Sequence, residues 1–316
     1  MDLKRIKTVM IVLLIAVNAF FLYNIISNYR ENNYIDDATI SNACEILEKS
    51  EIYVERAAVP KKKIDLSVYE SFFYDSHNES IVEAVSGSGV ERTFSLPDGM
   101  RFVSENGDTV EFTGQFGISY LSHAAKREDD FEKIIEDAVF RGEAFIVESV
   151  YKKTKNMLSD DVSPTVGPAK LGVVCAATHF DDKSGYSVIK FTQTMDGTPI
   201  YSHDVFCVFD GEELLYMSGL WCFLPTDAKY SSQHYDQINI LFMEKKNIEK
   251  EREENKDAEE NAEPEYRIEK VDAVYCTYFN NDKSGVYFIP AWRITYGDGR
   301  ESVYDAGSGT RYVGVE

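Results

Sequence analysis

Basic residues are scarce in this chain of 316 residues, which has 33 Lys and Arg against 54 Asp and Glu, a formal net charge of −21. Without Asp2, Lys4, Arg5 and Lys7, the remainder has 30 basic and 53 acidic residues, a net of −23. A field of this sign repels polyanions. We therefore exclude nucleic-acid binding, and we expect the body as a whole to repel wall polyphosphates and anionic head groups.

Cysteine is also scarce, and no two cysteines form a C-x-x-C pair. The chain has five, an odd number that cannot make a complete intramolecular disulfide set. We expect small apolar side chains that fill buried positions on helices and strands. One disulfide between neighbouring strands stays open as an alternative. The five are Cys44, Cys175, Cys207, Cys222 and Cys276.

The local signatures of catalysis are missing. There is no G-x-S-x-G, no H-E-x-x-H, no P-loop and no G-x-G-x-x-G after a strand. The five histidines lie at least 24 residues apart, and although His179 and His203 could meet across a sheet, a zinc site needs further ligands. The sequence predicts no enzyme, no metal site and no cofactor. The other histidines are His77, His123 and His234.

One long apolar run is present. Residues 8–26 are uncharged, follow Lys4, Arg5 and Lys7, and end shortly before Arg30. At about 1.5 Å per residue, these 19 residues reach across most of a hydrocarbon core roughly 30 Å thick. Cations on the short N-terminal flank favour a cytoplasmic N-terminus. We predict that residues 1–30 are a cytoplasmic tip and a single-pass anchor in the cell membrane, which holds an extracytoplasmic domain.

A cleaved secretory signal is the competing interpretation, because it also begins with cations and an apolar stretch. Such apolar regions run for about 7 to 15 residues and end in a small-x-small cleavage site. Here the run is longer, and residues 23–27 (YNIIS) contain no A-x-A pattern. We expect the segment to be retained.

Asn18 is the most suggestive polar residue of the apolar run. An amide in hydrocarbon seeks a partner, and interhelical hydrogen bonds contribute roughly 0.6–2 kcal/mol. Ala16 and Ala19 are small neighbours that permit close approach. We predict that these three residues contact the span of another protein. The alternative is that Asn18 bonds within its own helix or to an identical copy.

Beyond the run, the chain is predicted to be α+β, with antiparallel sheets and helices packed on one face. Three units are expected, at residues 31–125, 126–226 and 227–316. The last contains an acidic stretch at 249–265, which is expected to be a frayed helix end that leads into a solvated loop. In the first, Asp36 or Asp37 caps a helix, and Asp98-Gly99 and Asn106-Gly107 mark hairpins. Its strands or extended segments are predicted at 51–56, 65–73, 80–85, 91–96, 101–104 and 109–113.

The second and third units share a plan. A helix is predicted at 131–150, with strands at 171–178, 186–195, 200–209 and 214–223. Asp196-Gly197 and Asp210-Gly211 are predicted to be turns between these strands. A weaker helical pattern at 232–245 precedes strands at 266–279, 286–296, 300–305 and 310–313. The tetrapeptide DKSG stands at 182–185 and again at 282–285, with similar flanks. We predict a tandem repeat of two α+β units.

Several short segments resemble the YycH/YycI family, and YycI most closely. They lie at both ends of the chain, at residues 1–8 (MDLKRIKT), 17–22 (VNAFFL), 43–54, 59–60, 289–294 (IPAWRI) and 304–309 (YDAGSG). The closing strands also look like the small PepSY-type module of a helix and a sheet. On this plan, the acidic stretch looks like an insertion.

The resemblance implies a non-enzymatic regulator of a two-component system. Family members are membrane-anchored auxiliary proteins that contact a sensor histidine kinase and a sister YycH-like regulator, through the membrane helix and the ectodomain, and tune cell-wall homeostasis. Asn18 is the position carried over as a contact residue. The alternative is a tethered PepSY-like binding module that inhibits a cell-wall hydrolase or peptidase.

Overall fold

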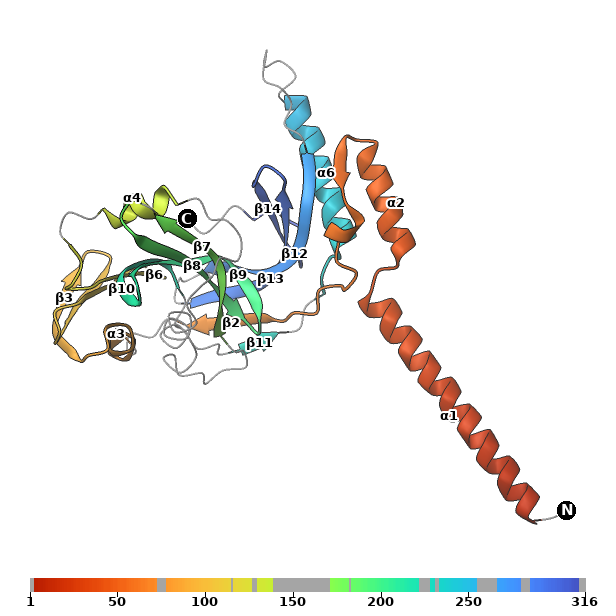
Figure 1. Cartoon of the computed structure of the whole chain (residues 1–316). Helices are drawn as coiled ribbons and strands as arrows, with labels where there is room; N and C mark the ends of the chain where they lie inside the picture. Colours follow the sequence, from red (N-terminus) through yellow and green to blue (C-terminus); the bar gives the residue numbers. More distant parts are fainter. Residues whose placement is uncertain are drawn as a thin grey trace. The chain divides into compact units, whose positions relative to one another are not determined.

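The computed structural model divides the chain into two compact units (Figure 1). Unit 1 comprises Met1–Leu66, His234–Asp272 and Trp292–Arg311, and unit 2 comprises Ser67–Gln233, Ala273–Ala291 and Tyr312–Glu316. Both are discontinuous, whereas the sequence suggested contiguous segments. The structure describes residues 3–72, 78–114, 116–126, 130–138, 171–181, 183–221, 228–230, 233–254, 266–279 and 285–312.

Unit 1 combines helices with short stretches of sheet. Strand β1 pairs in parallel with the start of β12, Ile52 opposite Tyr266, and β14 pairs with β13. Its elements are α1 (Leu3–Asn33), α2 (Asp37–Glu48), β1 (Ile52–Val54), the 3-10 turn η1 (Arg56–Ala58), α6 (Gln237–Glu254), β14 (Glu301–Asp305) and parts of β12 (Tyr266–Phe279) and β13 (Gly285–Tyr296).

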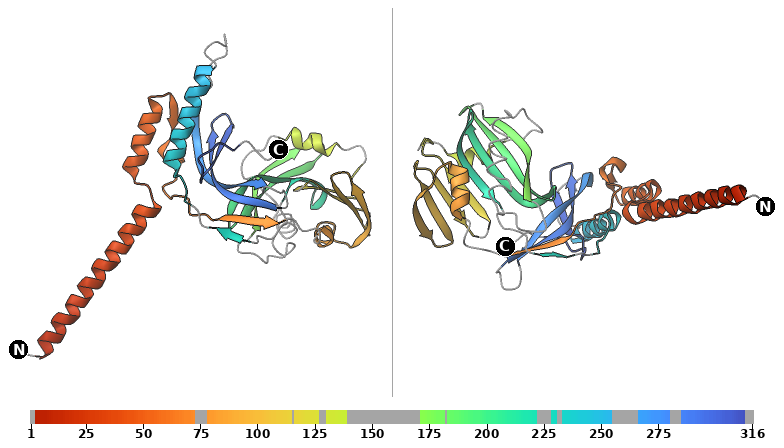
Figure 2. Two further views of the ribbon diagram at one scale, coloured as in Figure 1. Left: turned by 180° about the vertical axis from the view of Figure 1, so that it is seen from behind. Right: turned by 90° about the horizontal axis from the view of Figure 1, so that it is seen from below.

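The helix α2 confirms its predicted cap and spacing. Asp36 accepts a hydrogen bond from the Thr39 amide at 2.8 Å, so the first turn is closed by a side chain. Ile40, Ala43 and Leu47 are buried one above another. The helix α2 lies beside α6, as both views in Figure 2 show.

The helix α6 begins later than predicted and continues into the acidic stretch. It starts at Gln237, after Asp236 accepts a hydrogen bond from the Asn239 amide at 2.9 Å, and continues to Glu254. Residues 249–254 are helical, which agrees with the predicted helix end, and residues 255–265 of the predicted loop lie outside the described part. Two i,i+4 ion pairs support this extension, Lys245 with Glu249 at 2.5 Å and Lys250 with Glu254 at 3.5 Å.

Unit 2 is built on antiparallel strands, with one parallel pairing of Tyr275 to Ile200. The hydrogen-bonded order is β11-β2-β13-β12-β9-β10-β6-β5-β4-β3, and β8 joins β7 to β9. Its further elements are β2 (Val68–Phe72), α3 (Asn78–Ser86), β3 (Val90–Leu96), β4 (Gly99–Ser104), β5 (Thr109–Thr113), β6 (Gly117–Leu121), α4 (Phe131–Glu136), β7 (Leu171–Asp181), β8 (Tyr186–Met195), β9 (Thr198–Asp210), β10 (Glu213–Leu220) and β11 (Ala228–Tyr230).

The predicted hairpin dipeptides lie in or beside turns that connect consecutive strands of this sheet. Asp196 and Gly197 both have positive φ (49° and 79°) between β8 and β9, the geometry that a type I′ turn requires. Gly107 (φ 91°) turns the chain between β4 and β5, without a positive φ at Asn106. Between β3 and β4 the turn lies one residue earlier than predicted, at 97–98, and Gly99 without positive φ is the first residue of β4. The strands β5, β8 and β12 have the predicted bounds. The α+β class and its mostly antiparallel sheet are confirmed.

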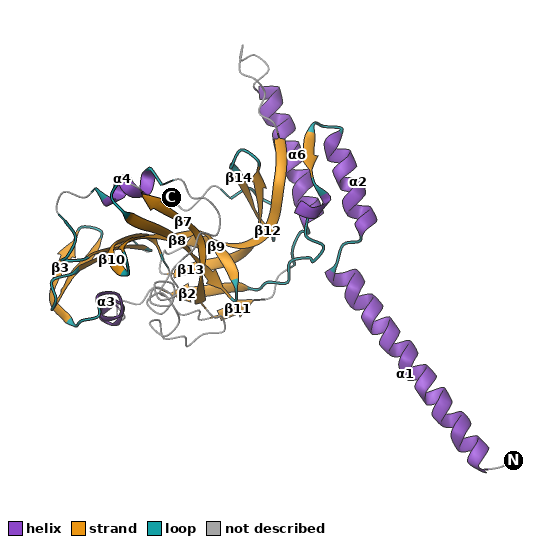
Figure 3. Cartoon of the chain, in the orientation of Figure 1, coloured by secondary structure: helices purple, strands orange, loops and turns teal. Residues whose placement is uncertain are grey.

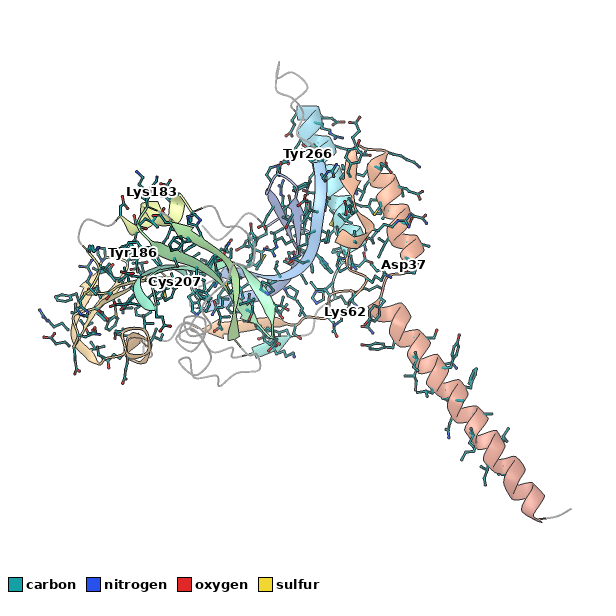
Figure 4. The ribbon with its side chains drawn as sticks, in the orientation of Figure 1. Asp37, Lys62, Lys183, Tyr186, Cys207 and Tyr266 are labelled. Atoms are coloured by element: carbon teal, nitrogen blue, oxygen red, sulfur yellow. The ribbon has the colours of Figure 1, made fainter. Side chains whose placement is uncertain are left out.

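The central strands of unit 2 are buried on both faces. Because side chains alternate along a strand, Cys207 packs with Phe191 and Met217 on one face, and Val208 packs with Tyr186 on the other. Figure 4 labels Cys207 and Tyr186 among these side chains. Burial of Cys207, and of Cys276 on β12, agrees with their predicted role as small apolar fillers; Cys222 lies outside the described residues.

The segment 80–85 is helical, so its prediction as extended is wrong. Ile81, Val82 and Val85 are buried at helical spacing, and α3 packs them against Phe102 and Val110 of β4 and β5. Figure 2 shows α3 lying against these strands. A short apolar run fits both periods, and here packing on the sheet selects the helix.

The helix α4 ends sooner than predicted. Asp130 accepts from the Lys133 amide at 3.1 Å and caps it, Phe131 stacks on Tyr216 at 5.3 Å, and the helix ends at Glu136. The predicted continuation to residue 150 lies mostly outside the described residues, from 139 onward.

Three further differences concern strands and the repeat. β6 and β11 were not predicted. Of the strand predicted at 310–313, the described residues 310–312 form only an isolated bridge, between Arg311 and Tyr304. Residues 182 and 280–284 lie outside the described part, so the tandem repeat stays a prediction.

Candidate functional site

The helix α1 exposes apolar side chains on every side. It is a single helix of 31 residues, about 46 Å long at 1.5 Å per residue (Figure 3). Large apolar side chains from Met10 to Tyr29 are 41–69% exposed, including the consecutive sets 13–15 and 20–23. Within the described part of the chain, no helix is both long and apolar enough to cross a membrane.

The three predicted contact residues lie on α1 and are exposed, but they do not share one face. Successive residues of an α-helix are about 100° apart, so Asn18 and Ala16 lie on nearly opposite sides. Ala16 and Ala19 are about 60° apart and make one small-residue face. The residues above and below Asn18 on its own face are large, among them Leu14 and Leu22. A helix packed against Asn18 would therefore not contact Ala16.

The end of α1 is tied closely to the rest of unit 1. Asn33 donates its amide to the Tyr29 carbonyl at 2.9 Å, and only Tyr34, Ile35 and the cap Asp36 precede α2. The rings of Tyr29 and Tyr34 meet edge to face with centroids 6.5 Å apart. Ile35 is buried, so the connection between the two helices is part of the fold.

A loop of three lysines, residues 61–63, is bound to this connection by backbone hydrogen bonds. The Ile35 amide donates to the Lys61 carbonyl at 2.8 Å, and the Lys63 amide donates to the Asn33 carbonyl at 2.9 Å. Lys62 forms an antiparallel bridge with Tyr34 between these two bonds. We call residues 33–37 and 60–63 the junction; Figure 4 labels Lys62 and Asp37 within it.

Two further contacts fix the junction. The Lys61 ammonium lies 2.8 Å from the Asp37 carboxylate at the start of α2. On the other side, Gln237, the fully buried first residue of α6, donates its amide to the carbonyls of Pro60 and Lys62. The sequence did not predict this contact, because no local pattern links residues 61–63 to residues 33–35.

A buried carboxylate organises part of unit 2. Asp108 accepts hydrogen bonds from the Tyr120 hydroxyl at 2.9 Å, the His123 amide at 2.9 Å and the Asn106 amide at 3.0 Å, and its Oδ1 lies 2.8 Å from His123 Nδ1. Burial alone would raise the pKa of Asp108, but the hydrogen bonds from His123, Tyr120 and Asn106 hold it below its ordinary value.

The Asp108 and His123 pair has one feature of a catalytic dyad, because a carboxylate orients an exposed imidazole. Among the described residues, no serine or cysteine side chain is hydrogen-bonded to His123. The contacts instead tie the end of β6 to the turn between β4 and β5. We interpret the cluster as structural.

A second buried carboxylate lies in unit 1. Glu244 of α6 accepts from the hydroxyls of Tyr296 and Tyr304, and Asn247 donates to the Tyr304 hydroxyl at 2.6 Å. Burial, followed by the negative charge of Glu244, raises the pKa of both tyrosines. These bonds join α6 to β13 and β14, so this cluster is structural as well.

The strand histidines are not brought together. His179 pairs with Val188 on β8, whereas His203 lies beside Gln193, five residues further along, or about 17 Å at 3.4 Å per residue. Burial lowers the pKa of His203 to about 3, which keeps it neutral against Phe116. Within the described ranges, no group of three or more His, Cys, Asp or Glu side chains is arranged to bind a metal.

Comparisons with known proteins identified no relative of the chain. No protein-family model matches the chain, and no curated protein has a significantly similar sequence. The likeness to the YycH/YycI family accordingly depends on the short segments quoted above.

Proposed function

We propose that residues 8–26 of α1 anchor the protein in a membrane, with the N-terminus in the cytoplasm and the rest of the chain outside. The uncharged run, its basic flank and the apolar exposure all around α1 support this proposal. Exposed apolar surface costs roughly 25 cal/mol per Å² in water, and a bilayer removes that cost on every side at once. A partner protein that covered one face of α1 would leave the other faces wet.

The anchored protein is proposed to regulate a sensor histidine kinase, together with a sister YycH-like regulator, without catalysis of its own. The family resemblance supports the identity of these partners. The junction supports the mechanism, because its backbone hydrogen bonds couple the orientation of α1 to α2 and α6. A contact made outside the membrane can then shift the equilibrium between two arrangements of the helices in the bilayer. The shift equals the difference in the energy of that contact between the two arrangements.

Replacing Asn18 by leucine tests the contact within the membrane. An interhelical hydrogen bond of roughly 0.6–2 kcal/mol corresponds to about a threefold to thirtyfold loss of affinity. Asn18→Leu should reduce co-purification of the kinase in mild detergent by this factor. Asn24→Leu makes the same chemical change six residues later and should have a smaller effect. Unchanged co-purification of the Asn18 variant would contradict the proposed contact.

Replacing residues 8–26 by an unrelated apolar helix separates the two candidate functions. A kinase regulator needs this span, so kinase regulation should be lost while insertion is kept. A tethered inhibitor of a cell-wall hydrolase or peptidase, with its PepSY-like repeat outside, needs only the tether. Full activity of the span-swapped protein would favour this second function.

A further inference from the structure

The lysine loop lies at a fixed distance, measured along α1, from the end of the apolar run. Asn33 lies seven residues beyond Ile26, which is about 10 Å along α1. The head-group region on each side of a bilayer is roughly 5–8 Å deep. Because the Lys63 amide is bonded to the Asn33 carbonyl, the backbone of the loop lies just outside this region. A lysine side chain has a long flexible stem and can reach back into it.

The backbone of the loop is held by hydrogen bonds, and two of its three lysine side chains are exposed. Its carbonyls at residues 60–62 are engaged by Gln237 and by the Ile35 amide. Lys61 and Lys62 are exposed, and Lys63 is half-buried. The backbone needs no ordering when an anion binds, so contact is opposed by side-chain entropy and, at Lys61, by the existing ion pair with Asp37.

Local charge distinguishes the junction from the acidic remainder. Charges more than about 10 Å away are largely screened at 0.1 M salt, so the chain's net −21 acts weakly here. Of the nearby acids, Asp36 is engaged by Thr39, and Asp37 is bound to Lys61. Lys62 has no ion pair with any described residue. The junction itself has three lysines and two aspartates, a formal charge of +1, so its position decides what the lysines contact.

Aromatic side chains mark the same level. Tyr29 and Tyr34 are exposed and pack on each other at the end of α1. Tyrosines are enriched where a membrane helix leaves the hydrocarbon, because their rings are apolar and their hydroxyls are polar.

From this arrangement we infer that Lys61, Lys62 and Lys63 bind the phosphates of anionic lipid head groups, and so hold unit 1 against the outer face of the membrane. The inference rests on the proposed anchoring of α1. It gives the regulator a fixed orientation relative to the bilayer, which a flexible tether would not provide.

Lysine reactivity in nanodiscs tests the contact. The full-length protein is placed in bilayers of phosphatidylcholine alone or with phosphatidylglycerol, and acetylation by a water-soluble N-hydroxysuccinimide ester is followed at each lysine by mass spectrometry. Phosphatidylglycerol should slow the reaction of Lys61 and Lys62 roughly fivefold each. Lys49, Lys246 and Lys250 serve as internal controls, because they lie about 14–20 Å from the junction along α2 and α6.

Matched variants give a second readout. Wild-type protein extracted in mild detergent should retain several-fold more phosphatidylglycerol than phosphatidylcholine. The variant K61Q/K62Q/K63Q should lose this preference, whereas K49Q/K246Q/K250Q, which has the same net charge, should keep it. Equal preference in both variants would overturn the inference.

The remaining outcomes separate the possible failures. Equal lysine reactivity in both bilayers overturns head-group binding but not anchoring. Protection by inorganic phosphate in phosphatidylcholine nanodiscs also overturns it, since the site would then bind free anions. A protein that does not enter nanodiscs rejects the anchor itself.

Discussion

The helices α1 and α6 of unit 1 differ in how far their apolar side chains are buried. In α6, Gln237, Leu241, Glu244 and Ile248 are buried along one stripe, and exposed charged residues such as Lys246 and Lys250 lie off it. In α1, apolar side chains are exposed around the whole circumference. A helix with one buried stripe is stabilised by packing that stripe against the rest of its own protein. A helix that is apolar on every side cannot bury all of its surface in this way, but a lipid bilayer would cover every side. This difference supports the proposed membrane location of α1.

The largest expected effect contrasts two leucines. Leu241→Ala opens a cavity in a fully packed position and should lower the free energy of unfolding by about 2–5 kcal/mol. Leu14→Ala removes the same atoms from an exposed position of α1 and should leave that free energy unchanged. Denaturant unfolding of both variants in mild detergent measures the difference, and equal losses would break the comparison.

An effect of similar size concerns a polar member of the α6 stripe. Glu244→Ala leaves the hydroxyls of Tyr296 and Tyr304 without their acceptor, at a cost of about 1–3 kcal/mol for each buried hydroxyl left unpaired. The same unfolding measurement applies. Glu253→Ala, on an exposed position of the same helix, is the control and should change stability little.

Acidification should weaken unit 2 through Asp108 without affecting the proposed membrane anchor. The pKa of Asp108 is lower in the folded state than its ordinary 3.8, so its contribution is present above that value and is lost as pH falls through the folded pKa. The stability difference between wild type and Asp108→Asn should therefore shrink on acidification below about pH 4. A difference independent of pH would contradict the assignment, and membrane retention should stay constant throughout.

The smallest expected effect lies on the exposed side of α6. The Lys250 ammonium is 3.5 Å from Glu254 with both side chains mostly exposed, and such pairs contribute about 0.3–0.5 kcal/mol. Lys250→Gln should lower stability by no more than this, and less in high salt. A loss above 1 kcal/mol would show a structural role that the geometry does not contain.

The sequence predicts an element where a local rule decides it. Asp196-Gly197 could be assigned because few other residues tolerate positive φ at both positions, and α2 because its cap and apolar spacing agree. The segment 80–85 was misassigned because its few apolar residues suit either period until a sheet is present to pack on.

The candidate site was predictable only in part. The apolar run was visible as a run, but the junction depends on Lys61 and Lys63 meeting residues 33 and 35, a contact that no periodicity records. The weak pattern of α6 has a similar cause. Two of its four stripe positions, Gln237 and Glu244, are polar and are buried only because distant carbonyls and hydroxyls bind them.

Anchoring of α1 is tested most directly by the fate of the N-terminal segment in cells. Membranes are washed with alkaline carbonate, and the mass of the retained chain is determined. The account predicts an intact polypeptide that still contains residues 8–26, held in the membrane pellet, with the units accessible to protease from outside. Recovery of a chain cleaved near residue 27, free in the medium, would contradict it.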